Sequence, residues 1–295
     1  MITNKTKFDE YISEEVSKYR GEYRPLRSGI LRRLFVRKLA CGRIHPNPDD
    51  EFCDPKIGPN YEIVSRYSEQ IREARVKDRN PKLFEERVII ERIYPDGYIL
   101  LNGHHRWAAA IRMALPKLRV KVVNLTQVSD IHEMLRNAKH EKRVTLDLDE
   151  VVFASDPAEE AEKPLPFPLS LRYKERLRRG IPALFHYLKR EGYDIWVYSA
   201  HYYSMDHIQR FFGFYRAWVD GVVTGMGRKS RELQGNRKML EAMIAQKYPQ
   251  TIHVDNGALL RINSQTRDYE EFALSGNPAT WSREIMEIIG AFEKT

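Results

Sequence analysis

The stretch Arg143-Val-Thr-Leu-Asp147-Leu-Asp149-Glu-Val-Val-Phe153 places two acidic residues directly after a hydrophobic run. We expect Val144 to Leu146 to form a buried parallel strand, with Asp147 at its carboxyl end and Asp149 just beyond it. Open α/β sheets bind their ligands at the carboxyl ends of the strands. One carboxylate in that position can attack phosphorus while the other moves protons. The pair therefore indicates metal-assisted phosphoryl chemistry.

The C-terminal half continues with an alternation of helix-like and strand-like segments. We predict helices at 182–192, 203–212 and 236–248, and strands at 194–198, 219–223 and, as the last strand, 251–254. Such an alternation is typical of a doubly wound parallel sheet, which would bring Asp147, Ser199 and Asp255 to one edge. Lys238 would lie in the first turn of the third helix.

This ordered set of residues resembles the haloacid dehalogenase (HAD) phosphohydrolase superfamily over roughly residues 141–295. The resemblance implies a Rossmann-like domain in which Asp147 is the nucleophile that forms an aspartyl-phosphate and Asp149 is the general acid/base. Ser199 would hydrogen-bond the phosphoryl group, and Lys238 would offset the negative charge between nucleophile and phosphate.

The same resemblance implies a Mg²⁺ ion bound by the carboxylates of Asp147 and Asp255 and by the main-chain carbonyl of Asp149. A hard cation with oxygen ligands neutralises phosphate charge and lets an anionic nucleophile approach an anionic ester.

Two residues depart from the pattern of that superfamily. Asn256 follows Asp255 where the family often has a second acid, and Lys229 competes with Lys238 for the role of the cation. Lys238 is the preferred candidate because it is expected to open the helix that leads into the Asp255 strand.

The N-terminal half carries a second motif, Asn102-Gly103-His104-His105-Arg106-Trp107, after a predicted strand-turn-strand segment over 87–101. The motif is expected to open a helix. Glycine permits close backbone approach, the helix start offers free N–H groups, and histidine and arginine add positive donors. We therefore predict phosphate binding by Gly103, His104, His105 and Arg106.

This box, the Pro46-Asn47-Pro48 turn and a closing strand at 118–123 resemble the ParB/sulfiredoxin superfamily over roughly residues 34–126. The resemblance implies a small α/β domain that binds a nucleotide such as ATP, ADP or CTP. His104 stands where a sulfiredoxin would carry its reactive cysteine, so reduction of sulfinic acids is not expected.

Kinase-like members of that superfamily use an upstream acid to activate a hydroxyl group, and Asp49, Asp50 and Glu51 are all candidates for it here. The sequence does not choose among these acids. A chromosome-partition role is not expected, because no segment long enough for a helix-turn-helix follows residue 126 before the HAD-like half begins.

The expected fold class is α/β, with a small ParB/sulfiredoxin-like domain followed by a parallel-sheet HAD domain. The stretch 153–168 is rich in proline and acids, which indicates a loop and therefore a minimal cap. The predicted parts are a basic N-terminal arm (1–33), the ParB/sulfiredoxin-like domain (34–127), a helical connector (128–142) and the HAD-like phosphohydrolase domain (143–295).

Composition is that of a soluble globular protein, with 42% hydrophobic and 31% charged residues in a chain of 295. No apolar run is long enough to span a membrane, and the N-terminus lacks a signal-peptide core. The chain has only two cysteines, Cys41 and Cys53. We therefore expect a cytoplasmic protein in a reducing compartment, with no membrane partner.

The formal net charge is +8, and basic residues gather before the first domain. They can bind a nucleic-acid backbone, attract a nucleotide or another phosphorylated substrate, or pack against the second domain. The basic residues are Arg20, Arg24, Arg27, Arg32, Arg33, Arg37 and Lys38.

The leading hypothesis is a Mg²⁺-dependent, HAD-type phosphatase or phosphotransferase joined to a nucleotide-binding, kinase-like domain. Its substrate would be a phosphorylated small molecule or a nucleotide. One alternative is a phosphatase that processes nucleic-acid ends, with the basic N-terminal half binding DNA or RNA. Another is a nucleotide-gated switch without enzymatic activity. The sequence leaves the oligomeric state open.

Overall fold

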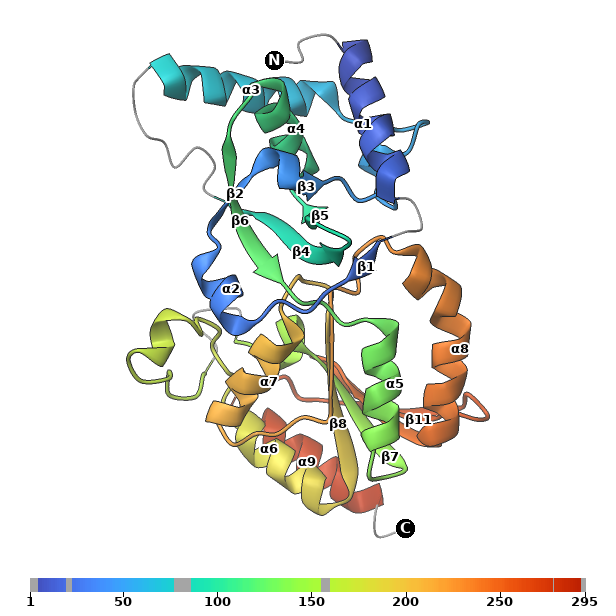
Figure 1. Cartoon of the computed structure of the whole chain (residues 1–295). Helices are drawn as coiled ribbons and strands as arrows, with labels where there is room; N and C mark the ends of the chain where they lie inside the picture. Colours follow the sequence, from blue (N-terminus) through green and yellow to red (C-terminus); the bar gives the residue numbers. More distant parts are fainter. Residues whose placement is uncertain (1–4, 20–22, 77–85, 155–159, 278, 293–295) are drawn as a thin grey trace. The chain divides into compact units, whose positions relative to one another are not determined.

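The computed structural model describes residues 5–19, 23–76, 86–154, 160–277 and 279–292 (Figure 1). The chain divides into two compact units. The first unit comprises residues 1–124 and 228–231, and the second comprises 125–227 and 232–295. Each unit is a mixed α/β structure with its own sheet. None of the described helices is both long enough and apolar enough to cross a membrane.

The first unit has a six-stranded sheet in the order β2-β6-β4-β5-β3, and β1 pairs with β4. Its elements are α1 (Lys5–Tyr19), β1 (Arg24–Pro25), α2 (Ile30–Phe35), β2 (Lys38–Ala40), β3 (Ile44–His45), α3 (Tyr61–Val76), β4 (Val88–Tyr94), β5 (Tyr98–Asn102), α4 (His104–Arg112) and β6 (Lys117–Val123). The predicted strand-turn-strand over 87–101 and the helix that opens after Gly103 are confirmed.

The core of the first unit centres on the fully buried Trp107 of α4. The first 33 residues, which were expected to form a basic arm, contribute to this core because Phe8 and Ile12 of α1 are buried in it. Within the same stretch, β1 pairs antiparallel with β4. Arg20 lies outside the described residues.

The second unit has a six-stranded sheet in the order β12-β11-β10-β7-β8-β9. Its elements are α5 (Val128–Asn137), β7 (Lys142–Asp147), a π-helical turn (Leu148–Val152), α6 (Ile181–Arg190), β8 (Tyr193–Ser199), α7 (Met205–Phe214), β9 (Gly221–Thr224), α8 (Arg231–Lys247, whose first residue clusters with the first unit), β10 (Gln250–Val254), β11 (Ala258–Asn263), β12 (Tyr269–Ala273) and α9 (Trp281–Phe292).

The predicted alternation of strands and helices is confirmed for β7 to β10, which pair in parallel. The prediction that 251–254 is the last strand is wrong. The tight turn at 255–257 sends the chain back antiparallel as β11, and β12 then pairs antiparallel with β11. A short turn of this kind can join only antiparallel strands, so the complete sheet is mixed.

The predicted start of the third helix at Asn236 is also wrong, because α8 begins at Arg231. Gly235 lowers the helix propensity of this stretch by roughly 1 kcal/mol relative to alanine, which a helix of 17 residues tolerates. Lys238 therefore lies in the third turn of α8 and not in its first turn.

The predicted connector over 128–142 contains α5, which a reciprocal pair of hydrogen bonds between Gln127 and Asp130 caps at its start. Its apolar face, which includes the predicted Ile131, Met134 and Leu135, is buried in the second unit. In the 153–168 stretch, residues 155–159 lie outside the described part. The described remainder contains no helix, and isolated bridges join Phe153 to Leu177 and Ala161 to Arg178.

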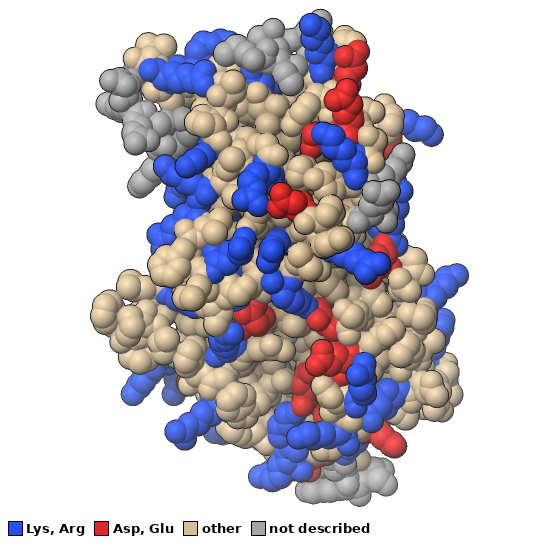
Figure 2. All heavy atoms as spheres, viewed as in Figure 1, with Lys and Arg blue, Asp and Glu red and all other residues tan. Residues whose placement is uncertain are grey.

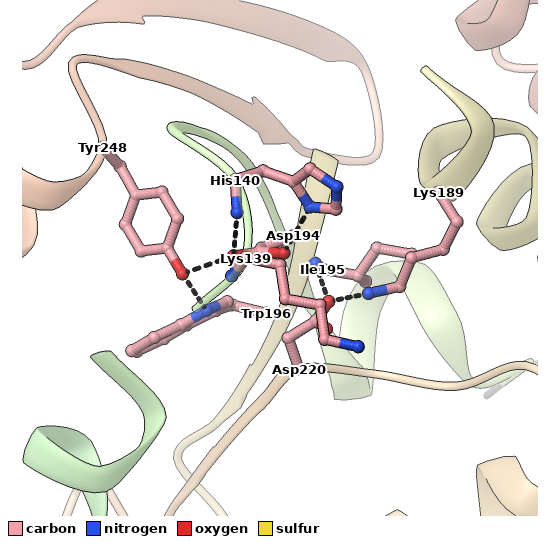
Figure 3. Close-up of polar contacts among 8 residues, drawn as sticks. All are labelled: Lys139, His140, Lys189, Asp194, Ile195, Trp196, Asp220 and Tyr248. Carbon is pink, nitrogen blue, oxygen red and sulfur yellow. Dashed lines mark hydrogen bonds and ion pairs between the residues drawn. The ribbon is translucent and has the colours of Figure 1, made fainter. Parts of the chain in front are cut away.

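A buried polar network holds the amino-terminal ends of β7 and β8 (Figure 3). The carboxylate of Asp194 is completely buried and accepts hydrogen bonds from the backbone N–H groups of Lys139 and His140, from the His140 ring at 2.7 Å and from the Tyr248 hydroxyl at 3.0 Å. Trp196 donates in turn to the Tyr248 oxygen at 3.2 Å. A buried carboxylate with this many donors fixes the segments that supply them. The network thus anchors the segment after α5 and the end of α8 to β8.

Candidate functional sites

The carboxyl ends of β7, β8 and β10 form the first candidate site. Asp147 pairs with Tyr198 across β7 and β8, and Leu146 pairs with Val254 across β7 and β10. The residues that follow this pair are Asp255 and Asp147, so these two acids leave the sheet side by side. Neighbouring strands of a sheet lie about 4.8 Å apart. Ser199 ends β8 at the same edge. The structure therefore brings together the three residues that were expected to share one sheet edge.

The order of the strands reverses at this point. From β7 the chain proceeds to β8 and β9 on one side of the sheet and then crosses to β10 on the other side. Ligands of open α/β sheets bind outside the carboxyl ends of the strands at such a reversal. Asp147 and Asp255 thus occupy the position in the second unit where a ligand is most expected.

Asp147 is half-buried, and hydrogen bonds to the backbone that follows it fix the orientation of its carboxylate. Its Oδ1 accepts hydrogen bonds from the backbone N–H groups of Asp149 at 2.7 Å and Glu150 at 2.9 Å. These bonds cap the π-helical turn, which buries Leu148, Val151 and Val152. π-Helical turns are rare in proteins, and those that do occur are often found at functional sites. Here it fixes two acids at the end of one strand.

The carboxylate of Asp149 is held on its Oδ2 side by groups that follow β8. Ser199 donates from Oγ at 2.6 Å, and Nδ1 of the His201 ring lies at 2.8 Å. The backbone N–H of His201 also donates to the Ser199 Oγ at 2.9 Å, which closes a ring of contacts. Burial and the neighbouring Asp149 and Glu175 raise the pKa of Tyr203, which also hydrogen-bonds Asp149.

Sequence reasoning missed His201, Tyr203 and Arg178. The first two stand directly after the end of β8, and the run His201-Tyr-Tyr203 following Ser199 was an available signal. Arg178 lies far from the motifs along the chain. Its backbone N–H donates to the carbonyl of Val152, and its buried guanidinium donates to Asn256 at 3.5 Å. It therefore links the π-helical turn to the turn that carries Asp255.

Lys238 does not fulfil its predicted position. It is exposed in the third turn of α8, and none of the contacts found among the described residues joins it to Asp147 or Asp149. Its rival Lys229 belongs to the segment 228–231, which clusters with the first unit. Asp255 is exposed, and its Oδ1 accepts the backbone N–H of Asn256 at 2.7 Å.

The sheet edge offers oxygen donors of the type that Mg²⁺ prefers, namely the carboxylates of Asp147 and Asp255 and the main-chain oxygen of Asp149. In the described part of the chain, no three or more histidine, cysteine, aspartate or glutamate side chains lie close enough to hold a metal. A site of two carboxylates and one main-chain oxygen does not require such a group, so the residues present fit this cation.

The amino-terminal end of α4 forms the second candidate site, in the first unit. Gly103 precedes the helix in a left-handed conformation with φ of +97°. A Cβ atom at this position would lie 2.8 Å from Cγ1 of Val88 and 3.0 Å from the Arg106 guanidinium. Glycine is therefore required both by the backbone conformation and by the lack of space.

The two histidines of this site are neutral near physiological pH, contrary to their expected role as positive donors. Burial lowers the pKa of His104 to about 4, and it also lowers the pKa of His105. Both rings pack on Phe52, with centroids 5.3 Å apart in each pair. Nε2 of His104 is buried and has no hydrogen-bond partner among the described residues, whereas Nε2 of His105 accepts from the backbone N–H of Asn60.

Arg106 is therefore the positively charged member of the box. Its side chain is buried, donates to Asn102 at 3.2 Å and lies 3.3 Å from the exposed carboxylate of Glu86. A guanidinium with an exposed and exchangeable acidic partner can transfer its hydrogen bonds to a phosphate.

The three candidate acids of the first unit have different surroundings. Asp49 and Glu51 form ion pairs with Arg231 and Lys229, at 2.9 and 3.1 Å. The Asp50 carboxylate instead lies 3.8 Å from Nδ1 of the buried His104. The same Asp50 oxygen accepts the backbone N–H of Phe52. Asp50 is thus the acid that faces the start of α4.

Basic residues are distributed widely over the surface. On the face drawn in Figure 2, lysine and arginine side chains are scattered over both units, and acidic side chains lie between them. On this face the charge pattern does not single out one continuous basic track.

No protein-family model, no curated protein and no solved structure matches this chain. The assignment of a function therefore depends on the chemistry of the two sites.

The buried His104 gives the first testable prediction. An unfolded histidine takes up a proton near pH 6.5, whereas folded His104 does so near pH 4. The stability that it contributes is complete above pH 6.5 and is lost as the pH falls towards 4, by roughly 2–3 kcal/mol. We expect His104→Gln to remove this part of the pH dependence, as measured by hydrogen exchange of the α4 amides between about pH 7.5 and pH 4.5.

His186→Gln is the matched control, because His186 is exposed. It should retain the pH dependence of the original chain. An identical slope in His104→Gln and in the original chain would show that His104 is protonated normally in the folded state.

Proposed function

We propose that the second unit is a Mg²⁺-dependent phosphohydrolase of the HAD type that works through an aspartyl-phosphate on Asp147. The observation that carries this proposal is the pair Asp147 and Asp149 at the carboxyl end of β7, where the strand order reverses. The parallel order β10-β7-β8-β9 supports the HAD resemblance. The lack of a helix among the described residues of 153–168 supports a minimal cap.

The residues suggest a two-step reaction in which protons and bonds balance. The Asp147 carboxylate attacks phosphorus as the bond to the leaving oxygen breaks, and Asp149 gives that oxygen a proton. Water then attacks the aspartyl-phosphate, its proton passes to Asp149, and the bond between phosphorus and Asp147 breaks. Phosphate is released and both acids return to their starting states.

The contacts of Asp147 and Asp149 each support one part of this reaction. The two backbone N–H groups on Oδ1 of Asp147 leave Oδ2 as the attacking atom. Ser199 and His201 hold Asp149 at the same edge. When bound by Asp147, Asp255 and the main-chain oxygen of Asp149, Mg²⁺ would neutralise the charge of the phosphoryl group. The predicted charge-offsetting role of Lys238 has no support from its position in α8.

Asp147→Asn tests the nucleophile. The amide oxygen of asparagine can still accept the two backbone N–H groups, so the fold should be retained. Release of phosphate from p-nitrophenyl phosphate with Mg²⁺ should fall by at least about 1,000-fold, because the amide is a poor nucleophile. Asp268→Asn, in an exposed turn of the same unit, should keep its activity. Equal turnover in both variants would rule out Asp147 as the nucleophile.

His201 is expected to position Asp149. Asparagine and glutamine, which each resemble one side of the histidine ring, test this role. An asparagine amide nitrogen can occupy the place of Nδ1, the atom that contacts Asp149, whereas glutamine places its nitrogen near Nε2. His201→Ala and His201→Gln should lower kcat by about 10-fold or more with little change in KM, and His201→Asn should restore most of it. Equal activities of the Asn and Gln variants would contradict the positioning role.

We also propose that the first unit binds nucleotide phosphates at the start of α4, as the ParB/sulfiredoxin resemblance implies. The free N–H groups of the helix and the Arg106 guanidinium are the donors. The left-handed Gly103 allows a phosphate to approach the backbone closely. Asp50, which faces this helix start, is the best candidate for the acid that activates a hydroxyl group.

Arg106→Gln tests this second site. Loss of a charged donor should weaken binding of ATP, ADP or CTP by roughly 10- to 100-fold in calorimetric titrations. Arg112→Gln is the matched control, since it removes the same charge from the other end of α4. Comparable affinities of the two variants, with folding confirmed by circular dichroism, would place the nucleotide elsewhere.

A further inference from the structure

The first unit contains a cavity of 590 Å³ that neither proposed activity uses. Two segments line it: α1, and the chain from Phe52 to Tyr61, where α3 begins. A volume of this size lies in the range of small-molecule binding sites.

The walls combine apolar, hydroxyl and acidic side chains. Ile12 and Phe52 are buried and give the cavity an apolar base. Hydroxyl and carboxyl groups surround that base. The lining residues are Asp9, Ile12, Ser13, Val16, Ser17, Phe52, Cys53, Asp54, Pro55, Ile57, Gly58, Pro59 and Tyr61.

The charge of this cavity is opposite to that of the whole chain. The chain has a net charge of +8, yet the described residues that line the cavity include two aspartates and no lysine, arginine or histidine. Asp9 accepts a hydrogen bond from the Tyr61 hydroxyl. Burial, together with the charges of Asp50 and Asp49, raises the pKa of the Cys53 thiol to about 12. Burial and Asp9 likewise raise the pKa of Tyr61.

We propose that this cavity binds a small organic cation, specifically a primary amine with a short apolar body. An ammonium group offers three hydrogen-bond donors and needs a carboxylate when it leaves water. Asp9 and the hydroxyl of Ser13, one helical turn away, provide acceptors for it. The apolar body would pack against Ile12, Val16 and Phe52, where it gains the free energy of burial. An anion would be repelled by both aspartates.

The cavity shares a wall with the start of α4. Phe52 lines the cavity and also packs on the rings of His104 and His105. The backbone N–H of Asn60, between the lining residues Pro59 and Tyr61, donates to His105. A bound amine would therefore be separated from the start of α4 by the side chain of Phe52. The amine site itself does not depend on the proposed nucleotide binding or on the phosphohydrolase activity.

The test uses the full chain and three probes of nearly equal shape: 2-phenylethylamine, 2-phenylethanol and phenylacetate. Binding near neutral pH is followed by calorimetry, and its location by protection of amides from hydrogen exchange. We expect the amine to bind at least about tenfold more tightly than the alcohol, phenylacetate not to bind, and protection to appear in α1 and in 52–61.

Asp9→Asn should bring the affinity for the amine down to that for the alcohol. Its amide oxygen can still accept from Tyr61, so the local fold should be retained. Glu10→Gln is the matched control, because Glu10 is the next residue of α1, is exposed and does not line the cavity. If Asp9→Asn fails to fold, Asp54→Asn provides the same comparison. Equal binding of amine and alcohol, equal effects of Asp9→Asn and Glu10→Gln, or protection confined to other segments would overturn the proposal.

Discussion

The parallel pairing of β7 with β8 on one side and with β10 on the other is the constraint on which the second unit depends. Val144 and Leu146 of β7 are completely buried in the apolar core, whereas Arg143 and Thr145 are buried on the opposite face of the sheet. A slip by one residue would exchange the two faces and move these polar groups into the apolar core. Once this register is set, Asp147 must leave the sheet beside Asp255. The candidate site thus follows from the same hydrophobic burial that forms the core.

The two ends of β8 use carboxylates for different purposes. At the amino-terminal end, Asp194 is completely buried and is surrounded by donors from two segments, residues 139–140 and Tyr248, as Figure 3 shows. A carboxylate in that environment stabilises structure and has no access to a substrate. At the other end, Asp149 is 19% exposed and contacts His201, which is 69% exposed. Such a carboxylate is held in place yet remains accessible, which acid/base catalysis requires.

The sequence predicted the features that arise from local patterns and missed those that arise from tertiary contact. Hydrophobic runs located β7, β8 and β10 to within one or two residues. The start of α8 was misjudged because Gly235 weakened a pattern that the rest of the helix sustains. The link from Arg178 to Asn256 joins residues 78 positions apart, and no short motif records such a contact. His201 was within reach of sequence reasoning, because it stands two residues after Ser199.

The first unit shows why motif chemistry alone cannot assign charge. From residue types alone, Gly103-His104-His105-Arg106 offers three positive donors, but burial favours the neutral form of both histidines. The positive potential at this site then comes from the N–H groups of α4 and from Arg106 alone. Likewise, the adjacent acids Asp49, Asp50 and Glu51 are distinguished only by tertiary contacts, because Arg231 and Lys229, about 180 residues later in the chain, pair with Asp49 and Glu51. Asp50, which has neither of these partners, is the acid whose carboxylate lies 3.8 Å from the His104 ring at the start of α4.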